Sequence, residues 1–270
     1  CKTAKRFFKQ CDELSVSYPS VMAMRPPNPN GWIQKTEGGS GGGHIKSLLN
    51  IQANQVNAQV HQAESIYYQK LQLGKSISCL FIASEHGAQV IGFSEQWLDS
   101  NDDEPFRYGG AVSHAGISEQ AITRFTNYVV NLAQAIGLVG INSCDAICDG
   151  NDVYVLEINP RLSATMDLYA GYLLMEKHVA ACQHTISASG IELNNTCPVS
   201  NAHQVIYANR PLTVKDDIIW PEWVCDLPKI GNYFSVGMPI CTVVAEAETA
   251  ALAKSLVHER AAALNDKLLN

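Results

Sequence analysis

The sequence predicts an α+β fold, in which helices cover antiparallel sheets. Three features of the chain carry this prediction. Residues 141–148 and 152–158 read as strands joined by the turn Asp149–Asp152, which is a hairpin signal. Residues 118–136 carry apolar side chains at helical spacing. Short strands and helices follow one another along the rest of the chain without an internal repeat.

The composition limits the class of protein. The chain has 270 residues, of which 46% are hydrophobic and 17% charged, so neither a disordered protein nor a collagen-like fibre fits. The net charge of −7 argues against a nucleic-acid scaffold. It still allows a few lysines and glycines to hold phosphate. We find no run of about 18 apolar residues and expect no transmembrane helix.

The nine cysteines are scattered and show no zinc spacing. We therefore expect free, mostly buried thiols in a reducing cytoplasm, and no signal peptide is visible. Because the chain begins at Cys1 without Met, a processed or truncated product is expected.

The N-terminal elements follow from local signals. Residues 2–14 place Phe and Cys side chains on one side of a basic helix, and the segment 18–20 ends it at a proline. The apolar run 21–24 reads as a short strand. Proline and asparagine make 26–31 a loop, and the strand 32–35 follows it.

The middle of the chain predicts more strands. Residues 66–69 and 76–83 read as strands on either side of a turn at Gly74, and 90–95 as another. The glycine-containing segment 109–114 reads as a loop.

The remaining elements complete the α+β pattern. Ser118 can cap the helix 118–136, and Gly137 ends it. Further on, we expect a helix at 167–187, strands at 203–208 and 239–244, and a helix at about 247–264.

A lysine followed by a glycine run is the first motif with chemical meaning. Lys35 ends a predicted strand, and Gly38–Gly43 includes Gly39, Ser40, Gly41 and Gly42. Consecutive glycines let backbone N–H groups approach phosphate oxygens, and the lysine adds positive charge. The segment is not a Walker A loop. A flexible surface loop is the alternative interpretation.

The second motif lies in the hairpin. Side chains alternate along a strand, so Glu157, Asn159 and Arg161 point to one face. Asp145 lies on the partner strand and supplies a second carboxylate. Carboxylate and amide oxygens suit Mg²⁺, and an adjacent arginine can stabilise charge on a transferring phosphoryl group. The alternative is a polar, solvent-facing side of a strand.

Together these motifs resemble the ATP-grasp superfamily, and within it the predicted carboligases related to biotin carboxylase. The resemblance implies an ATP-grasp fold, in which two α+β subdomains clasp ATP. It implies an ATP-grasp domain over 1–190, a small subdomain at about 20–70, a large one at about 71–190, and a small β-rich C-terminal region over 191–270. It also implies a preceding N-terminal α/β domain, which we expect to be missing from this chain.

The resemblance also assigns roles residue by residue. Lys2 and Lys35 match phosphate-binding lysines, and Gly39, Ser40, Gly41 and Gly42 match the loop over the phosphates. The hinge that binds adenine through its backbone matches Gln69, Lys70 and Leu71. Asp145, Glu157 and Asn159 match metal ligands, and Arg161 the catalytic arginine. One departure is Lys70, where the family commonly has glutamate, and this puts side-chain recognition of adenine or ribose in doubt.

The resemblance implies a Mg²⁺- (or Mn²⁺-) and ATP-dependent ligase that joins a small carboxylate to an amine through an acyl phosphate. It suggests biosynthesis of a one-carbon-carrier cofactor of the methanopterin or methanofuran type. An ATP-binding module without ligase activity and a biotin-type carboxylase are the alternatives. A homodimer is a further expectation. His114, Asp226 and Lys229 are additional candidates for the substrate side.

Overall fold

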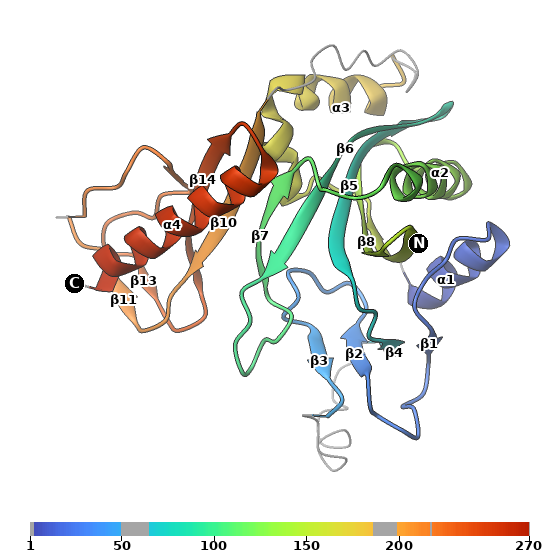
Figure 1. Ribbon diagram of the computed structural model, residues 1–270, viewed down its shortest axis with the longest axis horizontal. Helices are drawn as coiled ribbons and strands as arrows, with labels where there is room; N and C mark the ends of the chain where they lie inside the picture. The colour runs from blue at the N-terminus through green and yellow to red at the C-terminus, as the bar shows by residue number, and fades with distance from the viewer. Residues whose placement is uncertain (1–2, 50–64, 186–198, 217, 270) are drawn as a thin grey trace.

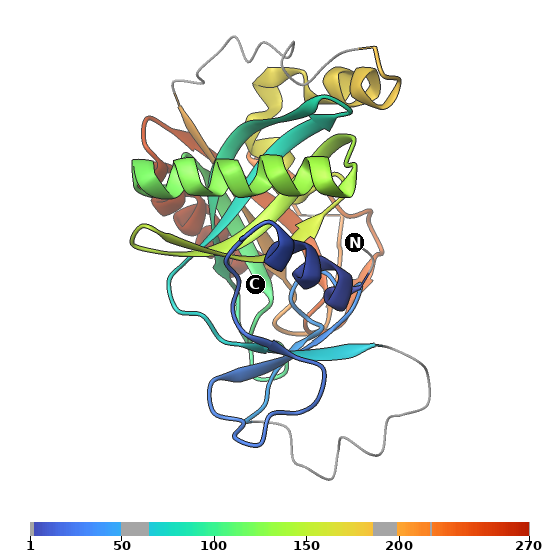
Figure 2. The same cartoon turned by 90° about the vertical axis from the view of Figure 1, so that its right-hand side faces the viewer.

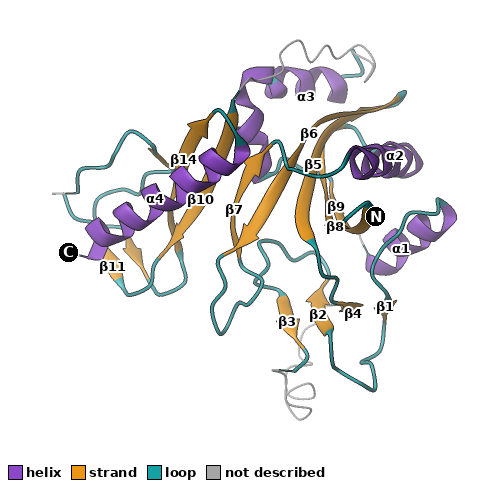
Figure 3. Cartoon of the chain, in the orientation of Figure 1, coloured by secondary structure: helices purple, strands orange, loops and turns teal. Residues whose placement is uncertain are grey.

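The computed structural model describes residues 3–49, 65–185, 199–216 and 218–269. Two main antiparallel sheets and a separate two-stranded one, with helices against them, confirm the α+β prediction (Figure 1). The helices lie around the sheets (Figure 3). They are α1 (Ala4–Glu13), α2 (Glu119–Ile136), the 3₁₀ helix η2 (Ala164–Tyr172), α3 (Leu174–Cys182) and α4 (Ala250–Leu269).

The small sheet has the strand order β1-β4-β2-β3 and lies below the large sheet in Figure 1. Its strands are β1 (Val21–Met22), β2 (Trp32–Thr36), β3 (Ile45–Ser47) and β4 (Ile66–Lys70). All its neighbouring strands run antiparallel. The sheet therefore brings the predicted lysine strand β2 beside the predicted hinge strand β4.

The large sheet has the order β12-β14-β10-β7-β6-β5-β8-β9. Its strands are β5 (Lys75–Ser84), β6 (Gly87–Leu98), β7 (Tyr108–Ser113), β8 (Gly140–Asp149), β9 (Asp152–Asn159), β10 (Ser200–Tyr207), β12 (Val224–Cys225) and β14 (Pro239–Ala247). Two short strands, β11 (Leu212–Thr213) and β13 (Tyr233–Phe234), pair separately. The C-terminal strands β10 and β14 thus extend the same sheet that holds β8 and β9. We call this β8–β9 pair, which carries Asp145, Glu157 and Asn159, the predicted metal hairpin.

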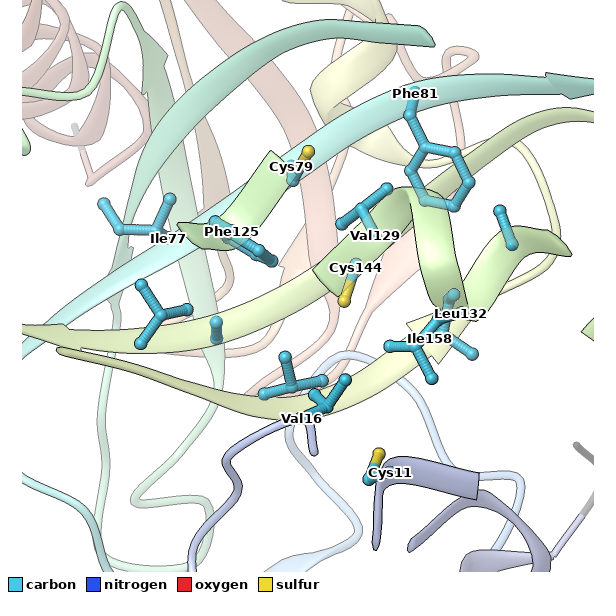
Figure 4. Close-up of a cluster of buried hydrophobic side chains, with 14 of the residues drawn as sticks. Cys11, Val16, Ile77, Cys79, Phe81, Phe125, Val129, Leu132, Cys144 and Ile158 are labelled. Carbon is cyan, nitrogen blue, oxygen red and sulfur yellow. The ribbon is translucent and has the colours of Figure 1, made fainter. Parts of the chain in front are cut away.

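One face of the large sheet is covered by α2 and α1 (Figure 2). Figure 4 shows Phe125, Val129 and Leu132 of α2 packed against apolar side chains of the sheet. Ser118 caps α2 by accepting a hydrogen bond from the Ala121 amide, and Gly137 ends it in the left-handed conformation (φ 74°), as the sequence predicts. Helix α4 covers β10 and β14 on the same side of the sheet.

The opposite face of the large sheet has two parts. Its apolar part is covered by η2 and α3, and its polar part faces the small sheet. Leu80, Ile82 and Ile141 pack there against Leu168 and Tyr169 of η2. Side chains two residues apart along a strand share a face, so Asp145 of β8 lies on the same side as Ile141. The fold therefore presents the predicted metal hairpin toward the lysine of the small sheet.

Two predicted elements are wrong. The segment 109–114 is mostly the interior strand β7, with only His114 beyond its end. The single helix predicted at 167–187 is instead η2 followed by α3, because Leu173 adopts a left-handed conformation (φ 51°) that breaks the helix. The last part of that predicted range lies outside the described residues.

Within the described residues no helix is both long and apolar enough to cross a membrane. The seven described cysteines are all free, and five of them are buried. Burial raises the pKa of the Cys11 thiol to about 12, so this side chain behaves as a core residue at neutral pH.

A buried histidine gives the large sheet a predictable response to acid. His203 of β10 is 4% exposed, and its Nε2 lies 2.6 Å from the Tyr108 hydroxyl. Burial lowers the pKa of His203 to about 4. An unfolded chain binds the proton near pH 6.5, so the unfolded state gains protons first as the pH falls. This side chain should therefore remove up to about 3 kcal/mol of stability between pH 6.5 and 4.

Urea unfolding at pH 7 and pH 4.5 should show a smaller acid-induced loss of stability in His203→Gln than in the wild type. The exposed His86 offers a control, since His86→Gln should leave the difference unchanged. The Asp145 carboxyl, whose pKa is raised to about 6, acts in the opposite direction but is common to all three proteins. Equal losses in wild type and His203→Gln would contradict the assignment.

Candidate functional site

Lys35 connects the two sheets at the candidate site. Its side chain is 3% exposed, and its Nζ lies 3.2 Å from Oε2 of Glu157 on β9. Burial alone would lower the pKa of Lys35, but the charge of Glu157 and the neighbouring Tyr67 outweigh it and raise the pKa. The lysine is therefore charged at neutral pH and points at the predicted metal pair.

The hairpin β8–β9 brings the two predicted carboxylates together. Asp145 and Glu157 are directly paired across the strands. The Nδ2 group of Asn159 donates to Oδ2 of Asp145 at 3.0 Å and to Oε1 of Glu157 at 3.4 Å. The structure thus places all three predicted metal ligands within contact of one another, and Lys35 beside them.

The two carboxylates have opposite electrostatic environments. Burial and the negative charge of Glu157 raise the pKa of Asp145 to about 6. Burial would also raise the pKa of Glu157, but the charge of Lys35 and its hydrogen bond hold it below the usual value. Between the sheets, two carboxylates face a single buried lysine. The hairpin therefore lacks one positive charge, and a bound cation would supply it.

The donor set fits a divalent cation. Oδ1 of Asp145 is buried and accepts no hydrogen bond from the described residues. No third His, Cys, Asp or Glu joins the pair within the described parts of the chain. Mg²⁺ is commonly held by one or two carboxylates together with phosphate oxygens and water, so the set is sufficient for Mg²⁺ with ATP. Asn159 would have to turn its amide so that the oxygen, rather than Nδ2, faces the cation.

Arg161 lies just beyond the end of β9. Its side chain is exposed, with Nη1 donating to the Leu162 carbonyl at 3.1 Å and Nη2 to Oδ1 of Asn159 at 3.5 Å. It therefore contacts one of the predicted metal ligands, Asn159, and its exposed guanidinium is accessible to a ligand.

The glycine run begins where β2 ends. Gly38 and Gly41 have positive φ angles (76° and 69°), and a Cβ added to either would meet no atom of the described residues within 4 Å, its chain neighbours aside. Gly39 has no room for a Cβ, because the His44 ring would lie 2.1 Å from it. Ser40, between them, is exposed. The loop thus leaves open space at Gly38 and Gly41, while the Gly39 amide donates to the Thr36 carbonyl at 3.3 Å.

The three residues of the predicted hinge differ in the hydrogen bonds that they form. The Lys70 amide donates to the Ser20 carbonyl at 2.8 Å, and the Leu71 amide to the Gly31 carbonyl at 2.8 Å. These two backbone donors are therefore engaged within the protein. The buried Gln69 has an Nε2 group without a hydrogen-bond partner among the described residues.

Strand register places Gln69 on the face that carries Lys35. Gln69 pairs with Ile33 and Tyr67 with Lys35, and residues two apart on a strand share a face. The Lys70 side chain turns elsewhere, and its Nζ donates to the Asn30 carbonyl at 3.0 Å. The side chain of Gln69 thus has an unused donor on the face that carries Lys35, whereas the N–H groups of Lys70 and Leu71 are engaged.

The remaining candidate residues do not lie together at the hairpin in the described part of the chain. Lys2 lies outside the described residues. His114 follows β7 with φ 57°, and its Nδ1 lies 3.1 Å from the Ser200 hydroxyl. Asp226 accepts a hydrogen bond from Thr242 at 2.7 Å, and Lys229 is exposed. None of these contacts joins His114 or Lys229 to the metal hairpin.

Two residues of the site were missed by the sequence reasoning. Lys35 lies 5.9 Å from the ring centroid of Tyr67. His44 packs on Gly39, and burial, followed by the charge of Lys35, lowers its pKa. The pairing of the strands that carry Lys35 and Tyr67 could have pointed to Tyr67, but no local pattern indicates His44.

The chain is similar to known proteins in both sequence and fold. A family model described as the ATP-grasp domain matches residues 3–165. An uncharacterized protein of Methanocaldococcus jannaschii is 24% identical over 225 residues, covering 82% of this chain and 52% of its own length. The chain therefore spans about half of this curated relative.

Two solved structures show the same fold. The L-amino acid ligase from Bacillus licheniformis has a TM-score of 0.72 at 11% identity, covering 96% of this chain and 70% of its own. The biotin carboxylase domain of 2-oxoglutarate carboxylase from Hydrogenobacter thermophilus, in complex with MgADP and bicarbonate, has a TM-score of 0.68 at 12% identity, covering 93% and 63%. Because the family model covers more than half of the chain, this protein belongs to the ATP-grasp family.

Proposed function

We propose that the protein is an ATP-dependent carboxylate–amine ligase that acts through an acyl phosphate. The observation that carries the proposal is the contact between Lys35 and Glu157, which sets a buried cation of one sheet against a carboxylate pair of the other. The His44 ring, which lies against Gly39 of the glycine run, feels the charges of both Lys35 and Glu157, so the run lies near this contact. Such an arrangement of positive charge, carboxylates and glycines suits a nucleoside triphosphate and its metal ion held between two sheets.

The residues divide the work as follows. Lys35 and the backbone of the glycine run would bind phosphate oxygens, and Gln69 would contact the base. Asp145, Glu157 and Asn159 would hold Mg²⁺, which supplies charge neutralisation during phosphoryl transfer. Arg161 would stabilise the transferring phosphoryl group from the solvent side. A substrate carboxylate oxygen attacks the γ-phosphorus and ADP leaves. An amine then attacks the acyl carbon, and phosphate leaves with formation of an amide.

Similar proteins support this choice of chemistry. One is an L-amino acid ligase, and another is a biotin carboxylase domain bound to MgADP and bicarbonate. A biotin-type carboxylase therefore stays the alternative reaction, and a module that binds ATP without ligation is the alternative without chemistry. The one-carbon-carrier substrates expected from the sequence stay a prediction, since no described residue selects among carboxylates.

Calorimetric titration should detect Mg-ATP binding that is lost when Mg²⁺ is chelated. Phosphate release should then require a carboxylate and an amine together, in a panel of amino acids and polyamines. Phosphate release with bicarbonate alone would favour the carboxylase instead. Failure to bind ATP in the presence of Mg²⁺ would overturn the site assignment itself.

A further inference from the structure

The C-terminal half of the glycine run rests on a loop of the large sheet. The amide of Tyr108 donates to the Gly41 carbonyl at 3.0 Å. A Cβ on Gly42 would lie 1.7 Å from the Phe106 carbonyl oxygen, and one on Gly43 would lie 2.6 Å from Oε1 of Glu104. The residues in contact belong to the β6–β7 loop (99–107) and to the first residue of β7, and this loop extends toward β3 in Figure 1.

Arg107 holds the β6–β7 loop in shape. Its side chain is only 9% exposed. Its Nη2 lies 2.8 Å from Oδ2 of Asp99, and its Nε donates to the Asp99 carbonyl at 2.9 Å. Its Nη1 lies 3.7 Å from Oε2 of Glu104, the residue that touches Gly43. A planar guanidinium with several fixed donors can hold such a loop, and a lysine cannot reproduce that pattern.

Tyr207 of β10 contacts the β6–β7 loop through Arg107 and Tyr108. The Tyr207 ring on β10 lies 3.9 Å from the guanidinium carbon of Arg107. The Tyr207 hydroxyl donates to the Tyr108 carbonyl at 2.8 Å. Tyr108 is thus held at its carbonyl by Tyr207 while its amide holds Gly41. The path from β10 to the glycine run thus consists of direct, partly buried contacts.

We propose that Arg107 and Tyr207 are positioning residues, which fix the β6–β7 loop as the seat of the phosphate-binding glycine run. The inference rests on the proposed nucleotide site, because the glycine run matters only if it covers phosphates. It assigns a part in nucleotide binding to a loop and a strand that lie outside the glycine, hinge and metal motifs. A pre-formed seat reduces the entropy that the glycines lose when phosphate binds.

The expected signature separates phosphate binding from base binding. In Arg107→Lys, affinity for Mg-ATP should fall about tenfold, as expected when a charge-assisted network is broken. Affinity for adenosine, which does not reach the glycine run, should change less than about twofold. Tyr207→Phe removes one hydroxyl and keeps the ring, so it should weaken Mg-ATP binding in the same direction by about threefold.

The experiment measures both ligands by calorimetry on the full chain, with thermal unfolding as the check of folding. Arg124→Lys is the matched control, because Arg124 pairs with Asp152 at the far end of the metal hairpin. It should bind both ligands like the wild type. If Arg107→Lys fails to fold, Tyr207→Phe carries the test.

Equal losses of Mg-ATP and adenosine affinity would show a general structural defect and overturn the inference, as would unchanged Mg-ATP affinity in folded variants. A wild-type protein that binds neither ligand would instead overturn the proposed function, and the inference with it. The two failures are therefore distinguishable in one set of titrations.

Discussion

Glu157→Gln is expected to lower the turnover of the proposed ligase reaction by roughly a thousandfold or more. A metal ligand supplies several kcal/mol of charge stabilisation in phosphoryl transfer, and each factor of ten in rate corresponds to about 1.4 kcal/mol. The fold should survive the change. The carboxamide of the variant keeps one oxygen, which can still accept the hydrogen bond from Lys35, and removal of the charge relieves the repulsion with Asp145.

The measurement is phosphate release at saturating Mg-ATP and substrates, with thermal unfolding to show that the variant is folded. Asp149→Asn is a suitable control, because it removes one carboxylate charge from the exposed end of β8. It should keep wild-type turnover. Wild-type turnover in Glu157→Gln would sink the assignment of Glu157 as a metal ligand.

The β8–β9 hairpin could be predicted because its information is local. A short turn fixes the register of the two strands near the turn. A bulge between Asp145 and Ala146 then shifts the register by one residue, and only this shift sets Asp145 opposite Glu157, which the sequence pattern does not indicate. The contact between Glu157 and Lys35 could not be predicted either, because it joins residues 122 positions apart in different sheets.

Strand β7 escaped prediction for a physical reason that the structure reveals. A Cβ on Gly110 would lie 2.2 Å from the His203 carbonyl and 2.6 Å from the Trp97 ring. The glycine is therefore required by close packing inside the sheet, whereas in a sequence it reads as a loop residue. The break between η2 and α3 is hidden for the opposite reason, because Leu173 adopts a conformation that the sequence pattern gives no sign of.

The seat of the glycine run is also a long-range feature. Arg107 and Tyr207 are 100 positions apart, and nothing in either local pattern pairs them. Motifs therefore indicated candidate phosphate and metal residues, while the parts that hold these residues in place became visible only in the folded chain. This division is expected wherever a site is assembled between two sheets.

Lys35→Met should weaken Mg-ATP binding by about 10- to 100-fold. Loss of a charge-assisted contact to phosphate costs about 1.5–3 kcal/mol, and tenfold in affinity is about 1.4 kcal/mol. The unbranched methionine replaces the apolar stem of the buried lysine with little loss of packing. The control is Lys46→Met, since Lys46 is exposed on β3 and pairs with Gln34, which places it on the other face of the small sheet.

The same variant should respond more strongly to Mg²⁺ alone. Without Lys35, the carboxylates Asp145 and Glu157 face each other with no buried cation between the sheets, so the metal-free protein should be less stable than the wild type. If Mg²⁺ is held by this folded carboxylate pair, as proposed, it should recover part of that loss. Thermal unfolding with and without Mg²⁺ should therefore show a larger upward shift in Lys35→Met than in the wild type or Lys46→Met. An equal shift in all three proteins, together with unchanged Mg-ATP affinity, would place the phosphates and the metal elsewhere in the chain.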